Sequence, residues 1–391
     1  MYAILNLVFW ICLFLLVYCY LGYGILAFLI SIFRKKKPVP AGLPENELPA
    51  LTLLITAYQE SPSLREKIAN VQELDYPGEL LTVLMVVDEP DADTLAILDE
   101  HPWVKRHINA ERKGKYRAIC SAMERLDTPL VVFSDANCRL NAGALKKMVR
   151  HFWDPSVGAV AGEKKITYRG THSALGQAEG WYWEYESLMK KLDAGLYTVV
   201  GAAGELFSIR RELFRPLQEE VILDDLVISL QVCLLGYRIA YEPAAFATEL
   251  PSVTLKEEEK RKVRIAAGAF QSLHLLKGLL RSPLLFFQFL SRRLFRWIIS
   301  PLCLILLLPV NGWLASREVP FGFFHYFLFL QLIAYFMAFL GLILINRGKK
   351  AGMAGIPFYF LFMNYCMVRG FIRFLSGKQP VNWEKALRET A

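Results

Sequence analysis

The sequence has 391 residues, of which 54% are hydrophobic and 21% are charged. A mean hydropathy of +0.30 is too high for an ordinary soluble enzyme, yet there is too much charge for a protein made only of membrane spans. Residues 38–280 hold 28 Lys and Arg against 34 Asp and Glu, whereas residues 281–391 hold 13 against 3. The basic excess therefore lies beside the apolar segments, which favours membrane lipids as partners and argues against nucleic acid.

Two features indicate the cellular compartment. The seven cysteines form no C-x-x-C pair, which predicts reduced thiols and a cytosolic main domain. Residues 1–33 are apolar and are followed by four basic residues, 34–37. This segment is too long for a signal-peptide core and has its charge on the wrong flank, so it predicts a transmembrane helix with its C-terminal end in the cytoplasm.

Residues 38–280 are expected to form one soluble domain of strands alternating with helices. Strands are predicted at 51–57, 81–87, 104–108 and 130–134, with helices at 62–74 and 116–126. This alternation is typical of an α/β fold with a doubly wound, mostly parallel sheet. One edge of the sheet should then collect the polar residues that follow the strands, namely Tyr58, Glu60, Asp88, Lys115, Asp135 and Asn137.

Asp135 and Asn137 follow the apolar stretch Val131–Phe133, which is typical of a buried strand. Open α/β sheets bind their ligands at the edge where such strands end. Two oxygen ligands at this edge suit Mg²⁺ or Mn²⁺ bound together with a phosphate group. The alternative is a strand-end turn in which Asp and Asn serve only as turn residues.

Further candidates follow in the second half of the domain. The predicted helix 173–191 contains Trp181, Tyr182 and Trp183, which could stack on a ligand, although packing in a core is the more common role of such residues. A turn at 201–205, containing Gly204 and Glu205, precedes a strand predicted at 206–209, and glycine there allows the backbone to approach a ligand closely.

Asp224 and Asp225 precede a helix predicted at 226–235. Negative charge is favourable at a helix N-terminus, so capping is one interpretation of this pair. The other interpretation is a catalytic pair, which the family resemblance given below favours. Arg264 lies in the charged helical stretch 257–271, where a solvated face is the alternative.

The C-terminal part is expected to be membrane-associated. Residues 283–297 are amphipathic and basic, which predicts a helix in the membrane interface. Membrane helices are expected within 298–376, at 298–315, 322–346 and 355–372, followed by a basic tail at 377–391. Three full spans would place this tail outside the cell, against the charge rule, so a short or re-entrant last segment remains an alternative.

These motifs together resemble those of membrane-bound family 2 glycosyltransferases, such as the cellulose, hyaluronan and poly-N-acetylglucosamine synthases. Thr56–Glu60 resembles their first-strand signature, Val-Val-Asp88 their second, Gly-Lys115 their third, and Asp135-Ala-Asn137 their Asp-x-Asp motif. The resemblance implies a GT-A-type nucleotide-sugar-binding domain. It covers the soluble domain and extends into the stretch around Arg264.

The resemblance also implies roles for individual residues. Ala57, Tyr58, Glu60 and Asp88 would hold the base and ribose, and Lys115 would lie near the base or phosphates. Asp135 would bind the nucleotide and, with Asn137, the metal. Asp225 would be the general base with Asp224 as its acidic neighbour, and Arg264 would grip the diphosphate. Gly204, Glu205 and Trp181 would lie on the acceptor side.

Two positions depart from the family pattern. Asn137 stands where a second Asp is usual, which lowers the negative charge available to a metal. Arg261 and Ile265 replace the Gln and Trp of the Gln-x-x-Arg-Trp motif. The loss of the Trp removes a stacking surface for a growing glycan, which disfavours a processive enzyme.

The sequence thus predicts an inverting glycosyltransferase of the inner or plasma membrane with a cytoplasmic catalytic domain. It would move a sugar from a nucleotide-diphosphate sugar, most simply a UDP-sugar, to a hydroxyl of a lipid, lipid-linked or glycan acceptor, with Mg²⁺ or Mn²⁺. The alternatives are a processive polysaccharide synthase and a nucleotide-sugar-binding membrane protein without turnover. Homo-oligomers or export partners are compatible with each.

Overall fold

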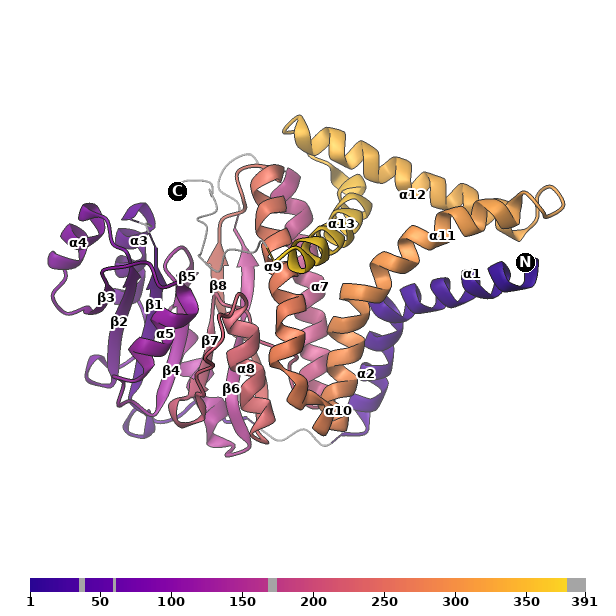
Figure 1. Cartoon of the computed structure of the whole chain (residues 1–391). Coiled ribbons are helices and arrows are strands. Elements are labelled where there is room, and N and C mark those ends of the chain that lie inside the picture. The colour runs from indigo at the N-terminus through magenta and orange to yellow at the C-terminus, as the bar shows by residue number, and fades with distance from the viewer. Residues whose placement is uncertain (35–38, 59–60, 168–173, 378–391) are drawn as a thin grey trace.

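The computed structural model describes residues 1–34, 39–58, 61–167 and 174–377. Within these residues, eight strands form one sheet in the order β3-β2-β1-β4-β7-β6-β8-β5 (Figure 1). The strands are β1 (Leu51–Ala57), β2 (Leu81–Asp88), β3 (Lys105–Asn109), β4 (Leu130–Asp135), β5 (Arg139–Leu140), β6 (Val157–Ile166), β7 (Phe207–Arg210) and β8 (Arg238–Glu249).

The register of the sheet brings the strand ends together. β1 pairs in parallel with both β2 and β4, and β2 pairs in parallel with β3. Thr56 is therefore opposite Asp135, and Asp88 is opposite Asn109. Only β7, between β4 and β6, and the short β5 run antiparallel to their neighbours in the described sheet. The predicted mostly parallel α/β sheet is confirmed.

Helices cover both faces of the sheet because the strand residues alternate between two apolar cores. Leu51, Leu53 and Ile55 pack with one set of helices, while Leu54 packs with the other. The first set is α3 (Ser61–Gln72), α4 (Ala92–Asp99) and α6 (Ala144–Val149), and the second is α5 (Lys115–Met123) and α8 (Asp224–Leu234). The resulting domain holds the site at the carboxyl edge of β1, β2 and β4.

A second layer of helices connects this domain to the apolar segments. It consists of α7 (Ala174–Leu196), α9 (Leu255–Leu275) and α13 (Gly355–Leu375) (Figure 1). Arg261 of α9 donates to Glu179 of α7 at 2.6 Å, and Tyr359 of α13 donates to Glu258 of α9 at 3.1 Å. These buried polar contacts fix α13 against the catalytic domain.

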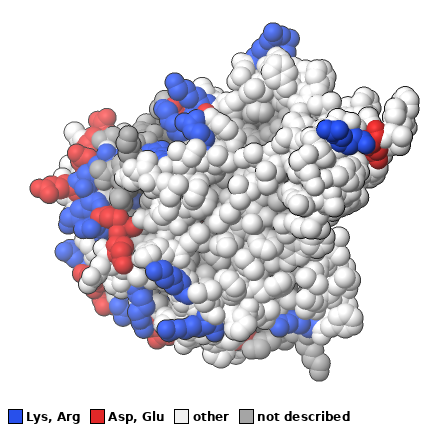
Figure 2. Space-filling view, turned by 45° about the vertical axis from the view of Figure 1, so that its right-hand side comes forward, with Lys and Arg blue, Asp and Glu red and all other residues white. Residues whose placement is uncertain are grey.

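Three segments of the described chain are long and apolar enough to cross a membrane: Tyr2–Ile32, Pro283–Ala315 and Phe323–Asn346. They comprise α1 (Tyr2–Val17), α2 (Tyr23–Ile32), α10 (Pro283–Phe289), α11 (Ser300–Ala315) and α12 (Phe323–Asn346), with π-helical stretches at Tyr18–Gly22 and Leu290–Ile299. Figure 1 shows α1, α11 and α12 extending away from the sheet. Figure 2 shows a broad face with few charged side chains, unlike the charged surface over the sheet.

The span expected at 355–372 is not among these segments. Its residues belong to α13, which lies against α9: a β-carbon added at Gly370 would lie only 2.3 Å from the Ala266 side chain. One face of this segment, with Phe358 and Phe362, packs in a cluster with residues of α7, α9 and α12, whereas Ile356 and Ile372 are exposed. An apolar sequence alone cannot distinguish such packing from packing on lipid. The basic tail beyond residue 377 lies outside the described residues.

The arginines of the segment expected at the membrane interface face α7. Arg292 donates to Glu186 at 2.7 Å and to Asp193 at 3.1 Å, and Arg296 donates to Glu186 at 2.6 Å. The Arg292 and Glu186 side chains are buried, so these cations contact protein carboxylates rather than lipid head groups. Burial alone would raise the pKa of Glu186, but the charges of Arg292 and Arg296 hold it well below its ordinary value.

Glu186→Gln should destabilise the fold by about 3–5 kcal/mol, because it leaves two buried arginines without their shared carboxylate. The expected result is a lower thermal unfolding temperature of the detergent-purified protein. Glu184→Gln, on an exposed position of the same helix, is the matched control and should have little effect. Equal unfolding temperatures for the two variants would contradict this account of the contact.

Candidate functional site

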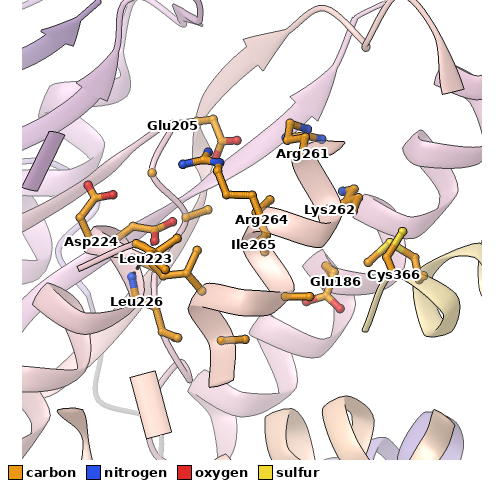
Figure 3. Close-up of a pocket in the computed structure, with 18 of the residues that line it drawn as sticks. Glu186, Glu205, Leu223, Asp224, Leu226, Arg261, Lys262, Arg264, Ile265 and Cys366 are labelled. Carbon is orange, nitrogen blue, oxygen red and sulfur yellow. Dashed lines mark hydrogen bonds between the residues drawn. The ribbon is translucent and has the colours of Figure 1, made fainter. Parts of the chain in front are cut away.

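A cavity of about 320 Å³ lies where the sheet edge meets α7, α8, α9 and α13. Figure 3 shows Asp224 and Arg264 toward one end and Glu186 and Cys366 toward the other. Its lining includes many of the residues singled out from the sequence: Lys115, Asp135, Asn137, Gly204, Glu205, Asp224, Asp225 and Arg264. Residues that are up to about 150 positions apart in the sequence therefore line the same cavity.

Lys115 connects two acidic residues from different elements. Its Nζ lies 2.8 Å from Asp135 Oδ1 at the end of β4 and 3.3 Å from Asp224 Oδ2 at the start of α8. Burial favours the neutral amine, but the two carboxylates raise the pKa of Lys115 above its ordinary value. The lysine is therefore a fixed cation that draws β4 and α8 together.

Asp88 positions the loop that presents Lys115. Its carboxylate accepts hydrogen bonds from the backbone N–H groups of Lys113 at 3.0 Å and Gly114 at 2.8 Å. Gly114 has a φ of +87°, which favours glycine, and α5 begins at the next residue. The Gly-Lys pair and Asp88 thus form one local structure, so Asp88 acts on the site at least through this loop.

Gly204 lies at the centre of the charged groups. A β-carbon added there would lie 3.4 Å from Asp225 Oδ2, 3.5 Å from Lys115 Nζ and 3.7 Å from Asp135 Oδ2. The absence of a side chain leaves room beside all three groups. The expectation that glycine here allows close approach is consistent with this geometry.

Asp225 is a cavity carboxylate whose pKa is raised by its surroundings. Burial and the neighbouring charge of Asp224 raise its pKa to about 7, although Lys115 opposes them. Its Oδ1 accepts the backbone N–H of Leu226 at 2.8 Å, which orients the side chain in the first turn of α8. Such a carboxylate can exchange a proton near neutral pH, as a general base must.

Arg264 provides an available cation in the same cavity. Its guanidinium extends from α9 toward Glu205 (Figure 3), yet it forms no hydrogen bond or ion pair with the described residues. Burial lowers its pKa from the ordinary value. A planar guanidinium held in this way can bind a diphosphate with two hydrogen bonds.

Glu205 is less available than the sequence suggests. Its carboxylate is paired with the buried ammonium of Lys164, which also pairs with Glu249. Burial opposes ionisation, but Lys164 lowers the pKa of Glu205 below its ordinary range. Glu205 is therefore a fixed anion of the cavity wall, and Lys164 is a residue that the sequence analysis missed.

The Asp135–Asn137 pair retains free oxygen atoms. Asn137 donates through Nδ2 to Glu249 at 3.3 Å, while its buried Oδ1 has no hydrogen-bond partner in the described part of the chain. Asp135 uses Oδ1 for Lys115 and Thr56, and Oδ2 faces Gly204. One carboxylate and one amide oxygen fit a hard divalent cation whose other ligands come from phosphates. The described residues contain no group of three or more His, Cys, Asp or Glu side chains that could hold a metal alone.

The residues assigned to the base and ribose lie outside this cavity, at the ends of β1 and β2. Ala57 is buried, and the ring of Tyr58 lies under the Arg112 guanidinium at 4.2 Å. Arg112 was not expected from the sequence as part of this contact. Glu60 lies outside the described residues.

The aromatic assignment requires a correction. Trp181 does not line the cavity, whereas Tyr182 and Trp183 do. The ring of Trp181 lies by Gly355 of α13, 3.5 Å from where a β-carbon would stand. Because an α-helix turns by about 100° per residue, adjacent residues point in different directions, and the sequence did not reveal which faces inward. Trp181 has the packing role given above as the more common alternative.

The altered Gln-x-x-Arg-Trp motif can now be placed. Arg261 and Ile265 both line the cavity, but Arg261 is tied to Glu179 and Glu258 and connects α9 to α7, whereas Ile265 offers only an apolar side chain. The motif has therefore divided into one structural residue and one apolar wall residue. The carboxylates of α7 that pair with Arg261 and Arg292 had a sequence signal that was missed, since Glu179, Glu186 and Asp193 recur every seven residues along one face of α7.

A mostly parallel sheet with helices on both faces and acidic groups at its carboxyl edge defines a nucleotide-binding α/β domain of the GT-A type. The family model "Glycosyltransferase like family 2" matches residues 49–268, more than half of the chain. The chain therefore belongs to this glycosyltransferase family.

Relatives and solved structures agree with this assignment. The chain is 27% identical over 242 residues to a poly-beta-1,6-N-acetyl-D-glucosamine synthase of Staphylococcus aureus, covering 58% of this chain and 56% of that protein. A synthase of the same name from Staphylococcus epidermidis is 24% identical over 267 residues, or 63% of its length. The chain thus matches less than two thirds of these relatives.

The fold is also that of a mannosyltransferase from Pyrobaculum calidifontis, solved with GDP-mannose and Mn²⁺. The TM-score is 0.66 at 18% sequence identity, over 95% of this chain and 99% of that one. This likeness includes the membrane-associated helices as well as the sheet domain, because it extends over nearly the whole of both chains.

Gly204→Ala should leave the protein folded but lower kcat/KM by about 10²-fold, because the methyl group fills the space between Asp225, Lys115 and Asp135. The contacts it would make are ordinary van der Waals distances, so the fold should tolerate it. Gly78→Ala, which would place a methyl group in open space, is the control. Wild-type activity of Gly204→Ala would exclude a substrate position beside Gly204.

Proposed function

We propose that the protein is a membrane-embedded inverting glycosyltransferase that uses a nucleotide-diphosphate sugar. The observation that carries this proposal is Asp225, a carboxylate with a pKa raised to about 7 beside the open space at Gly204. UDP-sugars are the first donors to test. The names of the relatives suggest N-acetylglucosamine as the sugar, while GDP-mannose is the ligand of the structural neighbour.

In this proposal Asp225 accepts the proton of an acceptor hydroxyl. The oxygen then attacks the anomeric carbon of the donor from the face opposite the diphosphate, and the bond to the diphosphate breaks. Attack on the face opposite the leaving group inverts the configuration of the sugar. Asp224 supports this role because its charge helps to keep the pKa of Asp225 near neutral.

Two cations of this chain would stabilise the leaving diphosphate. Arg264 has no protein partner in the described chain and can donate two hydrogen bonds to phosphate oxygens. Lys115 lies beside Asp135, where it would meet the phosphates or base. Both cations are already in place before the negative charge develops, which lowers the cost of reorganisation.

A divalent metal would be held by Asp135 and Asn137 together with the diphosphate. When bound, it would supply positive charge to the leaving group. The free Asn137 Oδ1 and Asp135 Oδ2 support this assignment, as does the Mn²⁺ in the structural neighbour. Mg²⁺ and Mn²⁺ both prefer such oxygen ligands.

The catalytic domain would lie on the cytoplasmic side of the inner or plasma membrane. Basic residues follow both the first and the third candidate spans, at Arg34 and at Arg347, Lys349 and Lys350. With three spans, both groups fall on the same side as the sheet domain, in agreement with the charge rule. Placing α13 with the catalytic domain removes the conflict that a fourth span created.

Transfer should depend on pH through Asp225. Only the ionised carboxylate accepts a proton, so the rate should rise as pH increases through about 7 and fall about tenfold per pH unit below it.

Asp225→Asn keeps the shape of the side chain but cannot accept the proton, and it should abolish transfer while retaining nucleotide binding. The measurement is sugar transfer and release from UDP- and GDP-sugars by purified protein, with endogenous lipid extract as acceptor. Transfer at the wild-type rate by Asp225→Asn would remove this residue from the mechanism.

The metal assignment predicts opposite effects for two variants. Asn137→Asp should tighten Mn²⁺ binding because it adds a negative charge, whereas Asp135→Ala should weaken both Mn²⁺ and UDP binding. Calorimetry with UDP and electron paramagnetic resonance of Mn²⁺ measure these affinities without turnover. Metal-dependent UDP binding by Asp135→Ala would show that the site is elsewhere.

Processive polysaccharide synthesis is the second candidate, favoured by the names of the relatives. Against it, Ile265 offers no aromatic face at the position where related synthases have Trp, although Trp183 lines the same cavity from α7. Three candidate spans are also few to enclose a glycan channel within one chain. We therefore place single-sugar transfer first.

Product size decides between the two candidates. With excess donor, the product should carry one added sugar or very few, because a chain-building enzyme must retain its elongated product. The measurement is mass spectrometry of the products formed by the isolated protein. A ladder extending to tens of sugars would contradict single transfer and support processive synthesis.

A further inference from the structure

Lys190 of α7 is a buried cation that the proposed mechanism does not use. The residue is 3% exposed and lines the same cavity as Asp225 and Arg264. Its Nζ has no hydrogen-bond or ion-pair partner in the described chain. The aromatic rings of Trp183 and Tyr241 lie at 5.8 Å each, at the outer limit of a cation–π contact.

The carboxylates around Lys190 are bound to other groups. Glu163 accepts hydrogen bonds from Ser187 and Tyr241, Glu186 is held by arginines of the 290–299 stretch, and Glu205 is paired with Lys164. Burial lowers the pKa of Lys190 from its ordinary value, and these carboxylates oppose that shift only from a distance. The two other buried lysines beside Trp183, Lys164 and Lys262, each have a carboxylate partner.

A second cation faces the cavity near Lys190. Arg293 donates through Nε and Nη2 to the backbone oxygen of Val200, at 3.0 and 2.9 Å, so its Nη1 is left with only a 4.0 Å contact to Glu186. Arg293 is close enough to disfavour the charged form of Lys190. Two like charges buried beside one cavity repel each other, and Glu186, which attracts both, is already held by Arg292 and Arg296, so a further anion between Lys190 and Arg293 would be favourable.

Apolar residues of two further elements also line the cavity. Trp297 comes from the helix that leads into α11, and Met363 and Met367 come from α13. An anion bound here would therefore have an apolar environment on the side facing the candidate spans. This combination fits a phosphate group attached to an apolar chain.

We propose that Lys190 and Arg293 bind the phosphate group of the acceptor, and that the acceptor is a phosphate ester carried on an apolar chain. This inference rests on the proposed transferase function, because it names the acceptor class of the same cavity. Arg264 would bind the donor diphosphate, and Lys190 and Arg293 the acceptor phosphate. The acceptor hydroxyl would belong to a second group esterified to the same phosphate, and it would lie between the two anions, beside Asp225.

Binding measurements without turnover test this proposal. Calorimetry on the detergent-purified full chain, with UDP and Mn²⁺ present to occupy Arg264, compares farnesyl phosphate, farnesol and inorganic phosphate. We expect farnesyl phosphate to bind at least about tenfold more tightly than farnesol, and we expect Lys190→Met to lose that advantage. A single hydrogen bond from a charged group is strong enough to account for a tenfold difference in affinity. Lys191→Met, at the adjacent exposed position, is the matched control and should bind as wild type does.

Three results would overturn the proposal. They are unchanged farnesyl phosphate binding by Lys190→Met, equal binding of farnesol and farnesyl phosphate, and inorganic phosphate binding as tightly as farnesyl phosphate. The last would identify a site for free phosphate. Failure of UDP binding or sugar release would instead count against the proposed function, since the effect of Lys190→Met on farnesyl phosphate can be measured independently.

The direction of the change in thermal unfolding temperature distinguishes a ligand-binding lysine from a structural one. Lys190→Met removes an unpaired buried charge, so the empty protein should unfold at a higher temperature. Lys262→Met removes a lysine paired with Glu258 at 3.3 Å and should unfold at a lower one. If Lys190→Met lowers the unfolding temperature as Lys262→Met does, Lys190 is structural and the proposal fails.

Discussion

Two carboxylates from different parts of the fold, Asp135 at the end of β4 and Asp224 at the start of α8, face the ammonium group of Lys115. Without this cation the two acidic elements would repel each other and the cavity would not keep its shape. The same arrangement separates the roles of the adjacent aspartates. Asp224 shares the charge of Lys115, whereas Asp225 is left with a pKa near neutral, suited to accepting a proton.

A second set of buried charges connects the catalytic domain to the apolar helices. Glu179 and Glu186 of α7 bind arginines of α9 and of the 290–299 stretch, respectively. Because α7 also lines the cavity, the membrane-associated helices and the site share one wall. In the proposed function, an acceptor with an apolar part would thereby reach Asp225 at the sheet edge without crossing the soluble domain.

The sequence predicted those features that depend on local order along the chain. Asp135 and Asp225 were singled out at a predicted strand end and helix start, and Arg264 by its place in the altered Gln-x-x-Arg-Trp motif; all three line one cavity. The sequence did not show which faces of the helices containing Trp181 and residues 355–372 contact protein, because the direction of a helix face depends on its tertiary neighbours, here Gly355 against Trp181 and Ala266 against Gly370. Lys190 could not be distinguished from Lys191 by sequence, since only packing makes one buried and the other exposed.

The central claim is that Asp225 activates an acceptor hydroxyl for direct displacement of the nucleotide diphosphate. The configuration at the anomeric carbon of the product tests this claim most directly, and it can be read from the proton coupling constant in nuclear magnetic resonance spectra. A donor with an α-linked sugar should give a β-linked product. A product that retains the α-configuration would contradict the account.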